Sequence, residues 1–264
     1  MIAIIGGGKM GEALLAGLLA TGYDEGELLV TEPRHEQAAH LRERYGIDVV
    51  PGADAAKRAD VLILAVKPQQ LVSVLDELAP EMGPGRLVVS VAAGVATATV
   101  RERLPGDVAV VRAMPNTPAL LGKGMTAVAA ADGVTAEQVE HAQRLMRSVG
   151  EVVRVPEEHM DAVTALSGSG PAYIYLVAEA MIEAGVLTGV PRATAQQLVT
   201  QTISGAAAML TDSGEHPSLL REAVSSPGGT TIAALRELER GGVRSAFIDA
   251  VEAARDRSQE LSQG

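Results

Sequence analysis

The residues with the clearest chemical meaning are three glycines near the start of the chain. Gly6, Gly8 and Gly11 fit the spacing G-x-G-x-x-G, with Lys9 and Met10 between the last two. In this pattern one glycine permits a tight turn, one lets a pyrophosphate approach the backbone, and one lets a helix pack closely on a strand. A helix beginning here would offer unpaired N–H groups and its positive dipole end to phosphates. The pattern alone is a weak signal, and a glycine-rich turn that binds nothing is the alternative.

A strand and a helix must position these glycines. Residues 2–5 are apolar and rich in β-branched side chains, which predicts a short buried strand. Apolar residues recur with helical spacing over residues 12–21. Strand, glycine turn and helix is the context that a dinucleotide-binding turn requires, so we predict one here.

One acidic and two basic residues bear on the choice of nucleotide. Glu32 follows a second predicted strand, residues 28–31, at the distance where an acid bonds the ribose hydroxyls of NAD. Arg34 and His35 suit the 2′-phosphate of NADP instead. A solvated charge cluster at a helix start is a third interpretation, and this segment does not decide between them.

Small or polar residues follow three more predicted strands, residues 60–66, 86–91 and 108–112. Open α/β sheets bind ligands at the carboxyl ends of their strands. The candidate lining residues are Val66, Lys67, Pro68, Ala92, Ala93, Gly94 and Asn116. Asn116, between two prolines, offers a ligand both donor and acceptors. A plain strand-to-helix turn at Lys67, and backbone capping by Asn116, are the alternatives.

The order of elements predicts two domains. Strands alternate with helices up to residue 155, which predicts an α/β domain with a doubly wound, mostly parallel sheet over residues 1–155. Residues 156–264 show no strand, and the helical runs 170–184 and 191–210 are apolar or small almost all round. Such helices need cover on most sides. We therefore expect an all-α domain that forms an obligate homodimer, with a compact monomeric bundle as the alternative.

Composition excludes several classes of function. The chain carries 22 basic and 33 acidic side chains, a net charge of −11, which argues against nucleic acid as a partner. Because there is no cysteine, disulfides and thiol catalysis are excluded. The first strand leaves no room for a signal peptide, and neither apolar window, 87–100 nor 172–187, is a convincing membrane span. We expect a cytoplasmic protein that does not enter a membrane.

A second glycine loop lies in the helical part. Residues 225–231, Ser-Ser-Pro-Gly-Gly-Thr-Thr, precede a predicted helix. Backbone N–H groups and hydroxyls of such a loop can hold a carboxylate without a cation, which matters in an acidic protein. Serine and threonine capping beside flexible glycines is the alternative.

The side chains for common catalytic devices are missing. The five histidines are scattered without the spacing of metal ligands, and no lysine follows Lys123. A dehydrogenase acting on a hydroxyl usually needs a base such as histidine or lysine. An imine that already carries its proton needs only hydride delivery, orientation and a hydrogen bond to nitrogen.

Six motifs in order make the chain resemble the pyrroline-5-carboxylate reductases over essentially its whole length. They are Gly6–Gly11, Ala65–Pro68, Ala92–Gly94, Met114–Ala119, Ser167–Tyr173 and Ser226–Thr231. The resemblance implies reduction of 1-pyrroline-5-carboxylate to L-proline by NADPH or NADH, a Rossmann domain, and a helical domain interlocked with a partner subunit. It also implies larger rings of dimers, such as decamers. Lys9 departs from the asparagine or glutamine of many members.

The resemblance also assigns roles to residues. It implies that Gly6, Gly8, Lys9, Met10 and Gly11 contact the pyrophosphate, and that Ala65–Pro68, Ala92–Gly94 and Asn116 line the nicotinamide. Ser226, Gly229, Thr230 and Thr231 would hold the substrate, with Thr231 the candidate catalytic donor to the imine nitrogen. Arg34 favours NADPH over NADH. A β-hydroxyacid dehydrogenase, whose family needs a lysine in the helical domain, and a non-catalytic nucleotide sensor are the rivals.

Overall fold

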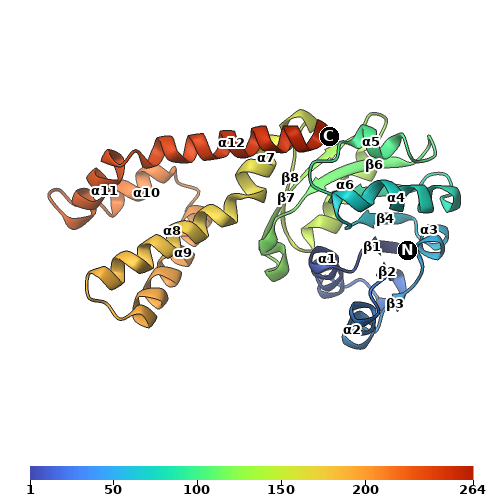
Figure 1. Ribbon diagram of the computed structural model, residues 1–264, viewed down its shortest axis with the longest axis horizontal. Coiled ribbons are helices and arrows are strands. Elements are labelled where there is room, and N and C mark those ends of the chain that lie inside the picture. Colours follow the sequence, from blue (N-terminus) through green and yellow to red (C-terminus); the bar gives the residue numbers. More distant parts are fainter. Residues whose placement is uncertain (264) are drawn as a thin grey trace. The chain divides into compact units, whose positions relative to one another are not determined.

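The computed structural model describes residues 1–263, which form two compact units. Unit 1 comprises Met1–Ser169 together with the segment that begins at Ala253, and unit 2 comprises Gly170–Glu252. Unit 1 holds the sheet and unit 2 is helical (Figure 1). This confirms the expected α/β fold followed by a helical region.

Unit 1 is built on one sheet, which has eight strands within residues 1–263. Its order is β3-β2-β1-β4-β5-β6-β7-β8, and every neighbouring pair is parallel except β6 and β7. The strands are β1 (Ile2–Ile5), β2 (Leu28–Thr31), β3 (Asp48–Val49), β4 (Val61–Leu64), β5 (Leu87–Ser90), β6 (Ala109–Met114), β7 (Gly124–Ala130) and β8 (Gly150–Arg154). The strand order reverses at β1, which pairs with both β2 and β4. Doubly wound sheets bind ligands at such a switch point.

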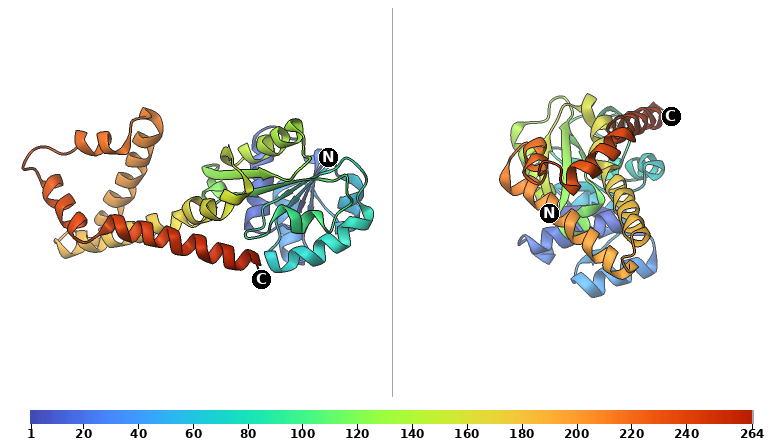
Figure 2. Two further views of the ribbon diagram at one scale, coloured as in Figure 1. Left: turned by 90° about the horizontal axis from the view of Figure 1, so that it is seen from above. Right: turned by 90° about the vertical axis from the view of Figure 1, so that its left-hand side faces the viewer.

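Helices cover both faces of this sheet (Figure 2). Because side chains alternate along a strand, Ile2 and Ile4 of β1 belong to one core, whereas Ala3 and Ile5 belong to the other. The first core is closed by α1 (Lys9–Ala20), α2 (His35–Tyr45) and α6 (Ala136–Arg147). The second is closed by α3 (Gly52–Arg58), α4 (Pro68–Leu78) and α5 (Thr97–Arg101). Burial on both faces explains why these strands are continuous apolar runs.

The segment after β8 packs on the sheet before unit 2 begins. It contains η4 (Glu157–His159), α7 (Met160–Val163) and a π-helical turn, η5 (Thr164–Gly168). Met160 is fully buried in a small core with Ala127 and Ala129 of β7. The compact units therefore divide after residue 169, whereas the change of sequence texture predicted a domain boundary at residue 155.

The last helix also returns to unit 1. In α12 (Val243–Gln263), Ser258 is buried and its hydroxyl donates to Asp161 Oδ1 of α7 at 2.7 Å. The turn around Leu261 lies beside Gly94, in the loop after β5. The C-terminal turns of α12 thus complete the α/β unit, although they follow the whole of unit 2 in the sequence.

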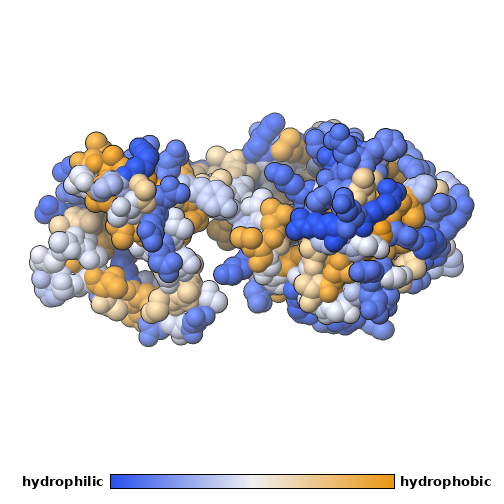
Figure 3. Space-filling model, turned by 90° about the horizontal axis from the view of Figure 1, so that it is seen from below, coloured by the Kyte–Doolittle hydropathy of each residue, from blue (hydrophilic) through white to orange (hydrophobic). Residues whose placement is uncertain are grey.

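Unit 2 contains α8 (Gly170–Leu187), α9 (Arg192–Ser213), α10 (Pro217–Ala223), α11 (Thr230–Arg240) and the first part of α12. Gly185 lets α8 approach Ala195 of α9 closely. Much apolar surface nevertheless stays uncovered, as Figure 3 shows, and Leu176 of α8 is 66% exposed. The other large exposed apolar side chains include Ile174, Tyr175, Leu198, Met209 and Ile248.

Such a surface favours packing against another chain, because soluble monomers rarely leave large apolar patches uncovered. Within residues 1–263, the helical run Glu157–Leu187 is long and apolar enough by composition to cross a membrane. One run of this kind is weak evidence for a membrane, since core helices of soluble proteins and signal sequences have the same length and composition.

Candidate functional site

The glycine turn after β1 requires glycine at its first position. Gly6 has a φ of +107°, a conformation that residues with a Cβ rarely adopt. Its N–H donates to the Thr31 carbonyl at 3.0 Å, which ties the turn to the end of β2. A Cβ on Gly6 would lie 2.8 Å from the Ala65 carbonyl oxygen, so the turn also packs against the loop after β4.

The other two glycines of the pattern differ sharply in their surroundings. A Cβ on Gly11 would collide with the Gly6 carbonyl oxygen, so α1 packs on the turn only with glycine there. A Cβ on Gly8 would meet nothing within 4 Å. Gly8 is also the N-cap of α1, and as a glycine it offers no side chain to cap that helix end. The open approach to α1 therefore suits a pyrophosphate.

The sheet brings the other predicted cofactor residues to the same edge. The carboxyl ends of β1, β4 and β5 are in register, with Ile5 opposite Leu64 and Leu64 opposite Ser90. The residues that follow these ends are therefore neighbours: Gly6–Gly11, Ala65–Pro68 and Ala92–Gly94. Lys9, Lys67 and Ala93 are exposed, whereas Ala92 is buried. Pro68 begins α4, as expected for a proline in a first helical turn.

Glu32 and Arg34, which suggested different nucleotides, bind each other. Arg34 Nε and Nη2 donate to the Glu32 carboxylate at 2.9 and 3.0 Å, and the backbone N–H of Arg34 adds a third bond at 2.9 Å. These bonds hold the pKa of the Glu32 carboxyl below its usual value despite burial. The side chain of Glu32 is only 3% exposed, and that of Arg34 is 65% exposed. The pair lies at the end of β2, beside Gly7.

Asn116 uses its amide to hold the backbone. Its Nδ2 donates to the Ser167 carbonyl at 3.0 Å, and its Oδ1 accepts the Met125 N–H at 2.9 Å. These two bonds join the loop after β6 to η5 and to β7. The structure thus gives Asn116 the capping role that was one of its two interpretations, and a contact of Asn116 with nicotinamide stays a prediction.

The second glycine loop leads directly into α11 of unit 2. Gly228 has a φ of +70°, and the Gly229 N–H donates to the Ser226 carbonyl at 3.0 Å. Thr230 and Thr231 form the first turn of α11, and no side chain caps this end. Thr231 is half-buried, whereas Ser226 and Thr230 are exposed. These hydroxyls therefore lie in the loop and first turn that begin α11, where a helix offers N–H groups to an anion, and a role in binding a carboxylate stays a prediction.

Sequence reasoning missed a buried network around Arg112. Arg112 lies in β6 and is 4% exposed, and its Nη1 is 3.5 Å from Glu157 Oε1 of η4. Glu157 in turn accepts both the N–H and the hydroxyl of Thr97. A charged residue inside an apolar predicted strand was the available signal. The partner is 45 positions away, and no local pattern names it.

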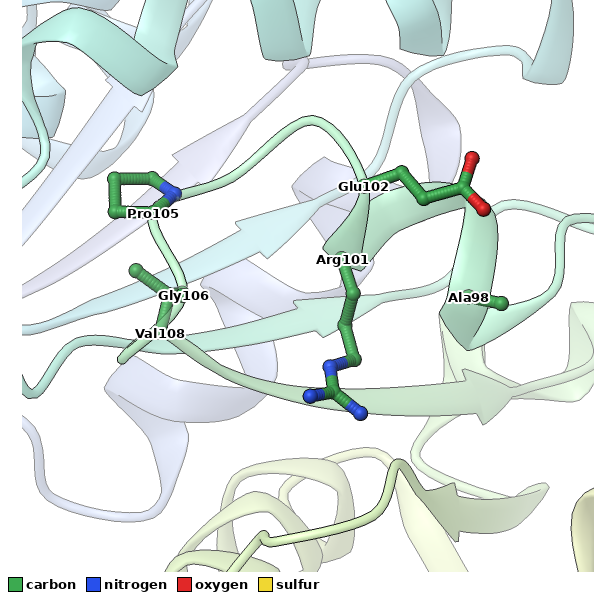
Figure 4. Close-up of a pocket in the computed structure, with 6 residues that line it drawn as sticks. All are labelled: Ala98, Arg101, Glu102, Pro105, Gly106 and Val108. Carbon is green, nitrogen blue, oxygen red and sulfur yellow. The ribbon is translucent and has the colours of Figure 1, made fainter.

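A shallow hollow of about 320 Å³ lies elsewhere on unit 1 (Figure 4). It is lined by Ala98, Arg101, Glu102, Pro105, Gly106 and Val108, from α5 and the turn before β6. None of these residues belongs to the predicted cofactor or substrate sites. This hollow is therefore separate from the candidate site.

The fold and the glycine turn at the switch point define the class of this protein: a Rossmann-type, dinucleotide-binding protein. Two family models match it. Residues 157–261 match pyrroline-5-carboxylate reductase dimerisation, and residues 1–94 match the NADP oxidoreductase, coenzyme F420-dependent, family.

Full-length relatives then identify the family. The pyrroline-5-carboxylate reductase of Corynebacterium melassecola is 48% identical, with 99% of this chain and 98% of that protein aligned. That of Escherichia coli is 40% identical over the same shares. A solved reductase from Coxiella burnetii superposes with a TM-score of 0.95 at 40% identity, covering 99% of this chain and 98% of that one. A Plasmodium falciparum reductase with NADP bound gives 0.87 at 30% identity, covering 99% and 97%. The chain belongs to the pyrroline-5-carboxylate reductase family, as its motifs predicted.

Proposed function

We propose that this protein reduces 1-pyrroline-5-carboxylate to L-proline, the last step of proline synthesis, with NADPH or NADH. Membership of the reductase family gives the reaction. The structural observation that carries the proposal is the open N-terminus of α1 at Gly8, between the tightly packed Gly6 and Gly11. A diphosphate fits there without any change of backbone.

In this proposal the two glycine loops hold the two anionic ligands. Lys9, Met10 and the glycine turn bind the pyrophosphate, and the residues after β4 and β5 lie along the nicotinamide. The N–H groups at the start of α11 and the hydroxyls of Ser226 and Thr230 hold the substrate carboxylate. Main-chain donors do most of this work, which suits a chain with a net charge of −11.

The proposed reaction needs little from the protein beyond orientation. When bound, the reduced nicotinamide would supply a hydride for C5 of the pyrroline, whose ring nitrogen already carries its proton, so that the C=N bond becomes the secondary amine of proline. The hydroxyl of Thr231 bonds the ring nitrogen and fixes the reacting face. No general base is required, which agrees with the lack of lysine and the single histidine, His216, in unit 2.

We propose NADPH as the preferred nucleotide because Arg34 is exposed and can turn to a 2′-phosphate. Glu32 then loses its hydrogen-bond partner. With NADH, by contrast, the Glu32 carboxylate can accept hydrogen bonds from the ribose hydroxyls while Arg34 stays bound to it. NADH thus remains a usable donor in this proposal. The preference for NADPH over NADH thus depends on whether the nucleotide binds Arg34 or Glu32.

We also propose a cytoplasmic homo-oligomer assembled through the helices of residues 156–264. The exposed apolar side chains of α8 and α9 support a homodimer as the minimal unit. Rings of such dimers, for example a homodecamer, would bury further surface. Nucleic acid and membranes have no part in this proposal.

Spectrophotometry tests the reaction. Purified protein with NADPH should lose absorbance at the reduced-nicotinamide band only when pyrroline-5-carboxylate is added, and proline should accumulate in equal amount. A nucleotide sensor would bind NADPH without turnover. A hydroxyacid dehydrogenase would oxidise a β-hydroxyacid with NADP⁺ and leave pyrroline-5-carboxylate untouched.

A further inference from the structure

Glu157 holds the start of α5 by two short hydrogen bonds. Its Oε1 accepts the Thr97 N–H at 2.7 Å, and its Oε2 accepts the Thr97 hydroxyl at 2.6 Å. The N-cap residue of α5, Ala96, has no side chain that could do this. A carboxylate 60 positions away thus replaces a local cap, and it also suits the positive end of the helix.

The negative charge of Glu157 balances the buried guanidinium of Arg112. Arg112 is buried with its Nη1 3.5 Å from Glu157, and Nη2 has no protein partner among residues 1–263. A buried guanidinium without a counter-charge is strongly destabilising. The pair therefore fixes the carboxylate in position, and the carboxylate in turn fixes Thr97.

Thr97 ends the loop that follows β5, and the other end of that loop is also anchored. Val91 donates its N–H to the Leu64 carbonyl at 3.0 Å, so the loop begins as an extension of the sheet. Between these anchors lie Ala92, Ala93 and Gly94, whose φ of +72° needs glycine. Ala92 is buried in the second core and its N–H donates to Ser90 Oγ, and Gly94 lies beside Leu261. The anchor at Thr97 therefore matters most for residues 93–96, which precede the helix.

We propose that Glu157 is a positioning residue for the cofactor, acting through Thr97 to hold residues 91–96 against the nicotinamide end of the bound nucleotide. The inference rests on the proposed function only for the identity of that ligand. The hydroxyl of Thr97 links the buried pair Arg112–Glu157 to the loop before α5, because the N-cap residue of that helix, Ala96, cannot cap it.

Thr97→Val gives the sharpest test, because it removes the hydroxyl and keeps the shape and the backbone bond. Thr97→Ser keeps the hydroxyl and is the matched control. Thr188→Val, which removes a local helix bond in unit 2, controls for the loss of a threonine hydroxyl elsewhere. Glu157→Gln is less informative, because it leaves Arg112 without its counter-charge and so lowers the melting temperature.

Three measurements are made on each variant as the intact protein. For Thr97→Val we expect amide hydrogen exchange of residues 91–97 to rise in the nucleotide-free protein. We expect the Kd for NADPH, measured by its fluorescence, to rise about 3- to 10-fold, and kcat to fall about 5- to 30-fold, as for a slightly misplaced reactant. Thr97→Ser and Thr188→Val should match the wild type in all three.

Unchanged exchange, Kd and kcat in Thr97→Val would overturn the proposal. So would a lower melting temperature with normal nucleotide binding and normal turnover per folded molecule, since that is a purely structural effect. If the wild type binds NADPH but reduces no pyrroline-5-carboxylate, the proposed function fails. The exchange and Kd results would then still decide the role of Glu157.

Discussion

Thr231 is the one side chain to which the proposed chemistry assigns contact with the reacting atoms. It lies half-buried in the first turn of α11, behind the positive-φ residue Gly228. Thr231→Ala should lower kcat about 10- to 10³-fold, the range for one lost orienting bond with some misplacement. Thr231→Ser keeps the hydroxyl and should retain much of the activity. Steady-state kinetics decides, and undiminished turnover in Thr231→Ala would remove this residue from the mechanism.

Arg34 carries the nucleotide preference in the same way. Arg34→Ala removes the guanidinium proposed for the 2′-phosphate, so the KM for NADPH should rise about tenfold, the value of one charge-assisted contact. The KM for NADH should change much less, because the ribose contact of Glu32 does not need the arginine. Kinetics with both nucleotides checks this, and equal increases in the two KM values would contradict the preference.

The bond between Arg34 and Glu32 also predicts a pH effect on stability. The pKa of Glu32 is lowered mainly by hydrogen bonds from Arg34. A carboxyl whose folded pKa lies below its unfolded value of 4.5 adds stability above that pH and loses it as the pH falls through the folded pKa. The wild type should therefore melt higher than Arg34→Ala at pH 6, and the difference should shrink as the pH falls below 4.5 and through the folded pKa. A constant difference across this range would contradict the prediction.

The glycines of the turn between β1 and α1 have different roles, which substitutions can separate. Gly11→Ala places a methyl group against the Gly6 carbonyl and should prevent normal folding. Gly8→Ala meets no protein atom, so the melting temperature should stay near that of the wild type while the Kd for NADPH rises at least tenfold. Gly26→Ala, also in open space, is the matched control and should change neither. Normal nucleotide binding by Gly8→Ala would separate this turn from the cofactor.

The same turn shows why much of unit 1 could be predicted. Four-residue apolar runs such as those of β1 and β4 reveal buried parallel strands, because both faces of the sheet are covered. By contrast, β3 has two residues and α5 has five, too few to show a period, and neither was predicted. Helix starts were also placed late: α1 begins at Lys9, because its first turn contains the glycine pattern itself.

Long-range pairings lay beyond local patterns. Asn116 lies between two prolines, as the sequence shows, but its partners Ser167 and Met125 could not be predicted from neighbouring residues. Likewise, residues 156–169 have the texture of the helical region, yet Met160 is buried against β7. The sequence predicts that such apolar residues are buried, but only the three-dimensional fold shows which unit they are buried in.

At the scale of the whole molecule, the apolar surface of unit 2 predicts self-association. Leu176→Arg places a charge on the exposed apolar surface of α8, and we expect it to shift the protein from dimer or larger assembly toward monomer. Sedimentation measures the change. Val72→Arg, at an exposed apolar residue of α4 in unit 1, is the matched control and should leave the assembly intact. A monomeric wild type would overturn the homo-oligomer.

The return of α12 to unit 1 has a consequence for the order in which the protein is made. Ser258 and its bond to Asp161 belong to the α/β unit, yet the ribosome adds them only after all of unit 2 has been synthesised. The surface of the nascent Rossmann unit around α7 is therefore covered only after the C-terminal turns of α12 have been synthesised. A chain that stops before Ser258 would lack the bond to Asp161 and leave the surface around α7 uncovered.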